Sequence, residues 1–251
     1  MGKAKEIVLR PITAQEANAL IRRVHYSGKV VQNSQLHIGA FYRGKLEGAM
    51  QFGPSLDKRK IMGLVDGTGW NEFIELNRLA FTDALPRNSE SRALAIAMKL
   101  LRKHAPQIKW VVSFADATQC GDGTIYRASG FVLTGMSVSE NLCRLNSGQV
   151  FHKMSLETGS NGKTKYKKYP EFGDKSYWEL TDGTYNFRKF AERIGAEVIP
   201  GYQLRYIYFI DPSYRERLTV PEIPYERIWE VGAGMYLGEK YDEQRAGEAT
   251  Q

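Results

Sequence analysis

An aspartate and, one short loop later, a tyrosine stand in the stretch SFADATQCGDGTIYRASGF, residues 113–131. The residues before it are apolar and typical of a buried strand, so Asp116 is expected at the end of that strand. A Gly-rich loop follows, and Tyr126 then falls on a short helix. A carboxylate and a phenol so placed can act as general base and general acid. The stretch therefore predicts a site of proton transfer, with a merely packed tyrosine as the alternative.

A second group of polar residues stands where a helix over about 91–105 begins. The start of a helix has free N–H groups and the positive end of the helix dipole, so it binds phosphate readily. The alternative is an ordinary capped helix, because Asn and Ser are common caps. The candidate anion-binding residues are Arg87, Asn88, Ser89, Ser91 and Arg92.

Composition and charge limit the function classes. The chain has 251 residues, 42% hydrophobic and 25% charged, enough for one sizeable core with a smaller insertion. A net charge of +7 favours an anionic partner, most commonly nucleic acid. No apolar run is long enough for a membrane span, and no signal peptide is expected. Cys120 and Cys143 suit free thiols in a reducing cytoplasm.

Alternating strand and helix patterns predict an α/β (α+β) fold with helices packed on a sheet. Thr13 is expected to cap the first helix, with Glu16 completing a capping box. The elements expected are strands over 7–13, 36–42, 46–53, 73–82, 108–116, 131–139 and 202–211, and helices over 14–25, 91–105 and 125–129.

The character of the chain changes over residues 143–201, which are rich in Gly, Lys and Tyr and weakly periodic. Within it, NGKTKYKK has four lysines and no acid, which suits phosphate contacts, or alternatively a solvated flexible loop. The candidate DNA contacts are Arg22, Arg23, Lys163, Lys165, Lys167, Lys168, Arg188 and Lys189.

Four segments follow from these patterns. Residues 1–142 are expected to form the core, and residues 143–201 a basic, aromatic-rich insertion that could contact DNA. Residues 202–238 should supply the final core strand and a C-terminal wrap, and residues 239–251 a disordered tail.

Taken together, HYSGKV, ELNRLAFTDALPRNSESRAL, VVSFADATQCGDGTIYRASGF and RYIYFID resemble the Mom DNA-modification proteins of Mu-like bacteriophages. The likeness covers most of residues 20–140 and the strand near 205. It implies a GNAT-like acyltransferase fold, with a mixed, mostly antiparallel central sheet flanked by helices. It also implies transfer of a carbamoylmethyl (acetamido) group to adenine N6 in double-stranded DNA, which blocks restriction, in the cytoplasm of a bacterial host.

The resemblance also implies roles for single residues. His25 and Tyr26 match the HY dipeptide, Asp116 the strand end and Tyr126 the short helix, and these four are the expected catalytic residues. Arg78 of ELNRL and the group at residues 87–92 are expected to hold acetyl-CoA or a related acyl donor. The glycine-rich Arg-x-x-Gly-x-Gly of acyl-CoA transferases is absent, and RNSESRA stands in its place. The loop at 120–122 also departs from the Gly-His of relatives.

Chemistry on adenine N6 raises a difficulty. The amine is neutral and a poor nucleophile, so Asp116 or His25 is expected to take its proton, and the base must flip out of the duplex. Ordinary acyl transfer would join N6 to a carbonyl carbon, whereas a carbamoylmethyl group is joined through its methylene. Either the donor differs or the carbon is activated otherwise, for example by a radical at iron. His25, Tyr26, Asp116 and Tyr126 offer N and O ligands for iron, without recognisable metal-ligand spacing.

Two other functions stay open: an ordinary GNAT N-acetyltransferase for a protein or small-molecule amine, and a non-catalytic DNA-binding protein on that scaffold. The basic insertion favours DNA modification over the first. The catalytic set favours it over the second, because a binding module has no need of those residues.

Overall fold

The computed structural model describes residues 3–119, 121–153, 156, 162–163, 165, 170–236 and 239–240. Its main sheet has eight strands in the order β1-β2-β3-β4-β5-β8-β6-β7, antiparallel except for the parallel pair β4 and β5. The predicted fold class, a mixed and mostly antiparallel sheet flanked by helices, is confirmed. The strands are β1 Val8–Pro11, β2 Leu36–Tyr42, β3 Lys45–Gly53, β4 Phe73–Phe81, β5 Trp110–Asp116, β6 Val132–Arg144, β7 Val150–His152 and β8 Glu197–Phe209, with a separate pair β9 Met235–Tyr236 and β10 Glu239–Lys240.

Helices connect these strands. The predicted capping box is present on α1, since the Thr13 hydroxyl accepts from the Glu16 N–H and the Glu16 carboxylate accepts from the Thr13 N–H. A short helix, α2, was not predicted, and the expected extended wrap contains η4 and α8. The helices are η1 Lys3–Glu6, α1 Ala14–Val24, α2 Lys58–Met62, α3 Ser89–His104, α4 Thr124–Ala128, η3 Pro170–Phe172, α6 Tyr177–Leu180, α7 Phe187–Ile194, η4 Pro212–Arg217 and α8 Glu226–Glu230.

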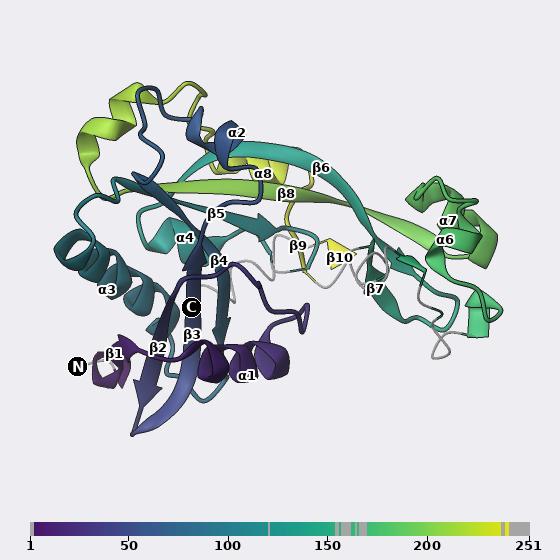
Figure 1. Ribbon diagram of the computed structural model, residues 1–251, viewed down its shortest axis with the longest axis horizontal. Coiled ribbons are helices and arrows are strands. Elements are labelled where there is room, and N and C mark those ends of the chain that lie inside the picture. Colours follow the sequence, from purple (N-terminus) through teal and green to yellow (C-terminus); the bar gives the residue numbers. More distant parts are fainter. Residues whose placement is uncertain are drawn as a thin grey trace.

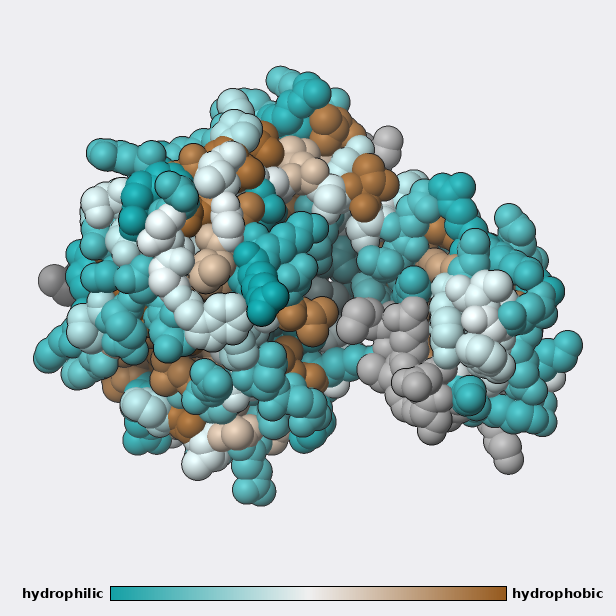
Figure 2. All heavy atoms as spheres, turned by 45° about the horizontal axis from the view of Figure 1, so that its top comes forward, coloured by the Kyte–Doolittle hydropathy of each residue, from teal (hydrophilic) through white to brown (hydrophobic). Residues whose placement is uncertain are grey.

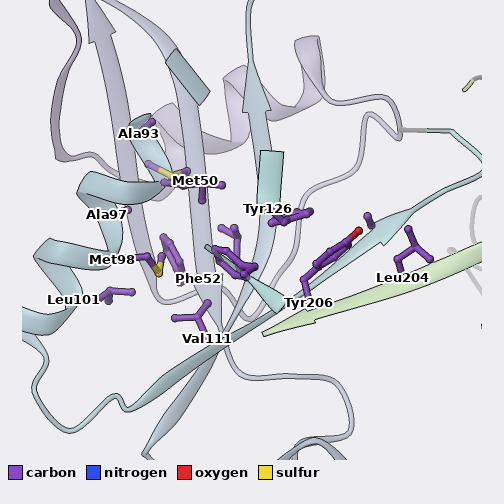
Figure 3. Packing of buried hydrophobic residues seen from close by; sticks show 14 of the residues in the cluster. Met50, Phe52, Ala93, Ala97, Met98, Leu101, Val111, Tyr126, Leu204 and Tyr206 are labelled. Carbon is purple, nitrogen blue, oxygen red and sulfur yellow. The ribbon is translucent and has the colours of Figure 1, made fainter. Parts of the chain in front are cut away.

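Different helices cover the two faces of the sheet. On one face, α3 packs Ala97, Met98 and Leu101 beside Met50 and Phe52 of β3 (Figure 3). On the other, α1 packs on small residues of β3 and β4, and α2 lies over β5 and β8 through a separate cluster. Below, these are called the α3 face and the α2 face.

The parallel strands β4 and β5 separate part of the way along their length. Their paired register runs from Phe73 opposite Trp110 only to Leu76 opposite Ser113, although both strands continue beyond that point. A bulge in β4 adds to this, because the register against β3 skips Asn77. Bulges bend strands and often lie beside functional sites. The sheet therefore opens between β4 and β5, at the ends where Arg78 and Asp116 lie.

Strands β6 and β8 run together far beyond the rest of the sheet and carry a second, smaller body (Figure 1; Figure 2). This distal lobe, residues 143–198, has its own core, built largely of aromatic residues from β7, α6 and α7. Its buried residues are Cys143, Leu145, Phe151, Leu156, Phe172, Tyr177, Leu180, Phe187, Phe190, Ala191 and Ile194. The expected segment limits at 142/143 and 201/202 fall inside β6 and β8.

No helix among the described residues is both long and apolar enough to cross a membrane. The expected tail from residue 241 onward lies outside the described residues.

Candidate active site where two parallel strands separate

A cavity of about 240 Å³ lies where β4 and β5 part, and is called the splay cavity here. It gathers His25 and Tyr26 from the end of α1, Arg78 from β4 and Tyr126 from α4. These residues come from three distant parts of the sequence. The splay therefore brings together three of the four predicted catalytic residues and one predicted donor-binding residue.

Tyr126 is held rigidly on the α3 face. Its ring stacks on Tyr206 at 5.2 Å between centroids (Figure 3). It also meets Phe131 edge-on at 5.4 Å. Its Oη lies 2.9 Å from the Ser113 Oγ. The turn before α4 requires glycine at 123, since φ is +74° and a Cβ there would lie 2.6 Å from the Tyr206 ring. The phenol is thus fixed at the wall of the cavity, as a proton donor requires.

His25 is held so that its ring is neutral and its tautomer is defined. The Ser27 N–H donates to His25 Nδ1 at 3.2 Å, so Nδ1 accepts and the neutral ring carries its proton on Nε2. Burial, helped by the Arg78 charge, lowers the pKa of His25 to about 4. As arranged, the ring offers the cavity a hydrogen-bond donor rather than a base. The Tyr26 ring lies tilted by 31° against it, with the ring centroids 4.3 Å apart, and Tyr26 is 48% exposed at the surface.

The lowered pKa of His25 predicts a pH dependence of stability. The native state keeps the ring neutral, while the unfolded chain binds a proton below its ordinary pKa of 6.5. Stability should therefore fall as the pH drops from about 6.5 to about 4, by about 2–3 kcal/mol from this residue. Urea unfolding at pH 7 and pH 4.5 should show a smaller loss for His25→Gln than for the wild type. An equal loss in both proteins would contradict the buried neutral ring.

Arg78 ties the bulged strand to the loop after α1. Its Nε donates to the Lys29 carbonyl at 3.1 Å and its Nη1 to the Asn77 carbonyl at 2.7 Å. These bonds use only part of the guanidinium, which has five N–H groups. Arg78 thus positions the segment that carries His25 and Tyr26, and it lines the splay cavity itself.

Asp116 is not among the residues that line the splay cavity. Successive side chains of a strand point to opposite faces, so Asp116 and Phe114 face away from Ser113, which contacts Tyr126. Its Oδ1 accepts from the Thr118 N–H at 3.0 Å. Asp116 lies directly opposite Gln203 of β8, on the α2 face. The structure therefore separates Asp116 and Tyr126 onto opposite faces of the sheet.

The start of α3 has the features of an anion site. Asn88 adopts a left-handed φ of 67°, the conformation that a glycine of the missing motif would supply, and α3 has no side-chain cap. Ser89 is 1% exposed, and within the described chain its Oγ and the Arg92 Nε have no hydrogen-bond partner. The Ser91 hydroxyl donates to the Asn88 carbonyl, and Arg87 is exposed. Unpaired buried donors beside a helix start fit a bound phosphate group.

One acid beside this helix start was not predicted. Glu90 lies in the first turn of α3 and lines the splay cavity. Burial, reinforced by repulsion from Asp83, raises the pKa of Glu90. This raised pKa reduces the negative charge that an anionic donor would meet there.

A second and larger cavity, about 590 Å³, lies on the α2 face and is called the sheet-face cavity here. Phe114 is among the lining residues of both cavities. Burial raises the pKa of Glu75 in this cavity, and its polar neighbours Ser55 and Asn77 partly oppose the rise. The sequence offered one signal for it, since Glu75 belongs to the same ELNRL motif as Arg78. The remaining lining residues are Ser55, Leu56, Asp57, Lys60, Ile61, Gly135, Met136, Ser137, Gln203 and Arg205.

The predicted DNA contacts divide into two groups. Arg22 and Arg23 are exposed at the end of α1, beside the splay cavity. In the distal lobe the charges are partly offset by acids. Arg188 pairs with Glu140, Lys189 with Asp182 at 2.7 Å and Lys165 with Asp174 at 3.7 Å, while Lys163 lies over the Trp178 ring. Lys167, Lys168 and Cys120 lie outside the described residues.

The predicted iron ligands do not fit a metal site. His25 Nδ1 is already engaged by the Ser27 N–H at 3.2 Å and lies 2.9 Å from the Ser27 Oγ. Asp116 faces away from Tyr126 and is engaged by the Thr118 N–H. Within the described part of the chain, no group of three or more His, Cys, Asp or Glu side chains could hold a metal ion. Burial raises the pKa of the free Cys143 thiol to about 12, so it is no thiolate ligand.

Comparison with known proteins identifies the family. The chain is 34% identical over 217 residues to the methylcarbamoylase Mom of Escherichia phage Mu, covering 86% of this chain and 80% of that protein. Similar solved structures include a Bacillus subtilis acetyltransferase in complex with CoA (TM-score 0.41, 10% identity, 81% of this chain and 97% of that one). Another is a GNAT family acetyltransferase of Elizabethkingia anophelis with acetyl-CoA bound (TM-score 0.42, 13% identity, 81% and 98%). The Mom protein family matches residues 6–227, and the chain belongs to that family.

Proposed function

We propose that this protein transfers a carbamoylmethyl group to N6 of adenine in double-stranded DNA, in the cytoplasm of a bacterial host, and so protects that DNA from restriction. The observation that carries this function is the splay cavity, which gathers His25, Tyr26, Arg78 and Tyr126 in a member of the Mom family. The relative in phage Mu is a methylcarbamoylase, and the exposed Arg22 and Arg23 beside the cavity suit a phosphate backbone.

The group donor is proposed to be acetyl-CoA or a related acyl-CoA. The start of α3 supports this, because the buried Ser89 Oγ and Arg92 Nε have no hydrogen-bond partner among the residues that the structure describes. Asn88 adopts the left-handed backbone conformation that a glycine would supply. Bound there, the donor would supply the two-carbon unit. Ser89 and Arg92 would hold its phosphates.

Residues on the two faces of the sheet would carry out the proton transfers and orient the base. On the α3 face, Tyr126 holds a proton at Oη for the leaving group, with Ser113 fixing the phenol. At the end of α1, the Nε2–H of His25 donates to an acceptor nitrogen of the base and orients it. The N6 amine gives up one proton, which a carboxylate on the α2 face accepts. Glu75 lines the sheet-face cavity on that face, while Asp116 lies opposite Gln203 at its edge.

Mass spectrometry of nucleosides from plasmid DNA tests the function directly. Plasmid from bacteria that express this chain should contain deoxyadenosine heavier by a carbamoylmethyl group. Plasmid from cells that carry an empty vector is the control. An acetylated deoxyadenosine would keep DNA as the substrate but return the chemistry to acyl transfer. Unmodified DNA from cells with soluble protein would contradict the proposal and favour an amine acetyltransferase.

A further inference from the structure

We propose that Leu56 is the wedge that fills the DNA stack when the target adenine flips out, and that the adenine enters the sheet-face cavity with its amino group toward Glu75. This inference rests on the proposed function and adds to it the residues that extract and receive the base. The segment concerned, residues 54–57 between β3 and α2, is called the wedge loop.

Leu56 has the exposure and position of a wedge. Its side chain is 99% exposed, the highest value among the large hydrophobic residues described as exposed, yet it stands at the wall of the sheet-face cavity. A single exposed leucine is ordinary on a protein surface. In a protein that acts on DNA, however, an exposed apolar side chain can serve as a wedge between bases. Leucine is one of the residues used in this way.

The wedge loop is firmly held at both sides of Leu56. Ser55 is buried on one side. On the other, the Asp57 carboxylate accepts from the Lys60 N–H at 3.2 Å and caps α2. A wedge must keep its shape while it pushes into a stack, so a fixed base with an exposed tip is the arrangement required.

Cations flank the tip. Arg59 and Lys60 follow Leu56 closely and are exposed, and neither forms an ion pair within the described chain. Lys58 lies 4.5 Å above the Trp70 ring, which is itself exposed. Free cations beside an apolar tip suit a duplex, whose phosphates lie on either side of a base step. In the distal lobe, by contrast, Arg188 and Lys189 are already paired.

The cavity beside the wedge loop suits a purine. Its volume of about 590 Å³ falls within the range of roughly 300–1,000 Å³ usual for ligand sites. Phe114 and Met136 offer apolar surface for a flat ring, and Glu75 and Gln203 offer polar atoms at its edge. A carboxylate accepts from the adenine N6 amine, and the raised pKa of Glu75 suits it to take the proton. Phe114 also lines the splay cavity, so the two cavities share this residue.

Permanganate oxidation of plasmid DNA bound to the purified protein tests the wedge without knowledge of the target sequence. A thymine left opposite a flipped adenine is unstacked, so wild-type protein should create thymines of raised reactivity, mapped by sequencing. Leu56→Ala should reduce that reactivity, and adenine modification in cells, by roughly tenfold or more, because flipping costs a few kcal/mol. Leu56→Met should keep both, since it remains an apolar wedge. Val8→Ala, which shortens a 60% exposed residue on β1, is the control and should change neither.

The variants separate the wedge from the receiving cavity. Glu75→Gln should keep the reactive thymines while adenine modification falls by roughly tenfold or more. Full modification by Leu56→Ala, or loss of modification with the reactive thymines intact, would overturn the wedge and leave the proposed function standing. If wild-type cells themselves contain no modified adenine, the proposed function fails and the wedge fails with it.

Discussion

Tyr126→Phe is expected to lower the modification of plasmid adenine by roughly 10²–10⁴-fold, the usual contribution of a positioned general acid. The substitution removes only the phenol oxygen, which lies 2.9 Å from the Ser113 Oγ at the wall of the splay cavity. The ring would keep its stacking on Tyr206 and its edge contact with Phe131. Nucleoside mass spectrometry on plasmid from cells with matched protein levels measures the loss.

The structure also predicts that Tyr126→Phe stays folded. The Ser113 hydroxyl lies 3.1 Å from the Leu76 carbonyl, so it keeps a partner when the phenol is gone. The loss of stability should therefore be about 1 kcal/mol. Tyr202→Phe, whose hydroxyl bonds the Val231 carbonyl, is the matched control and should keep full modification. Full modification by Tyr126→Phe would show that this tyrosine serves only packing.

Much of the fold could be predicted because its local patterns agree with its tertiary packing. The capping box at Thr13 and the unbroken apolar run of β4 are local signals, and both elements formed where expected. The helix α2 was missed because five residues, KRKIM, are too few to show helical periodicity. Its place is fixed by burial of Ile61 against β5 and β8, strands far away in the sequence.

The sequence predicted several residues of the candidate site, but it did not predict on which face of the sheet each of them lies. The motifs around His25, Arg78 and Tyr126 pointed to residues that the splay does bring together. The sheet-face cavity was missed because Glu75, Phe114 and Gln203 come from three strands whose adjacency depends on the strand order. Asp116 shows the same limit. Asp116 follows Ser113 by three residues, so strand alternation already places the two side chains on opposite faces of the sheet. This separates Asp116 from Tyr126 only because Tyr126 packs on the α3 face, which the sequence did not predict.

Residues 143–201 showed only weak periodicity because their apolar residues are largely aromatic and widely spaced, separated by Gly and Lys. In space these rings meet. Phe190 is fully buried and contacts Phe172 at 5.2 Å and Tyr177 at 5.1 Å between ring centroids. Because β6 and β8 extend well beyond the other strands, little of the main core supports this cluster. We propose that the distal lobe is a separate unit of stability on two long strands.

Phe190→Ala should destabilise the distal lobe by about 3–5 kcal/mol, the usual cost of removing a buried phenylalanine. Hydrogen exchange should therefore become about 10²–10⁴-fold faster at the amides of β7, α6 and α7, because local opening sets their exchange. The amides of α3 should keep their protection, since α3 packs in the other core. Val150→Ala, at a partly exposed position on β7, is the control and should change exchange little. Equal acceleration in α3 would show one cooperative unit, because the loss would then have passed along β6 and β8 into the main core.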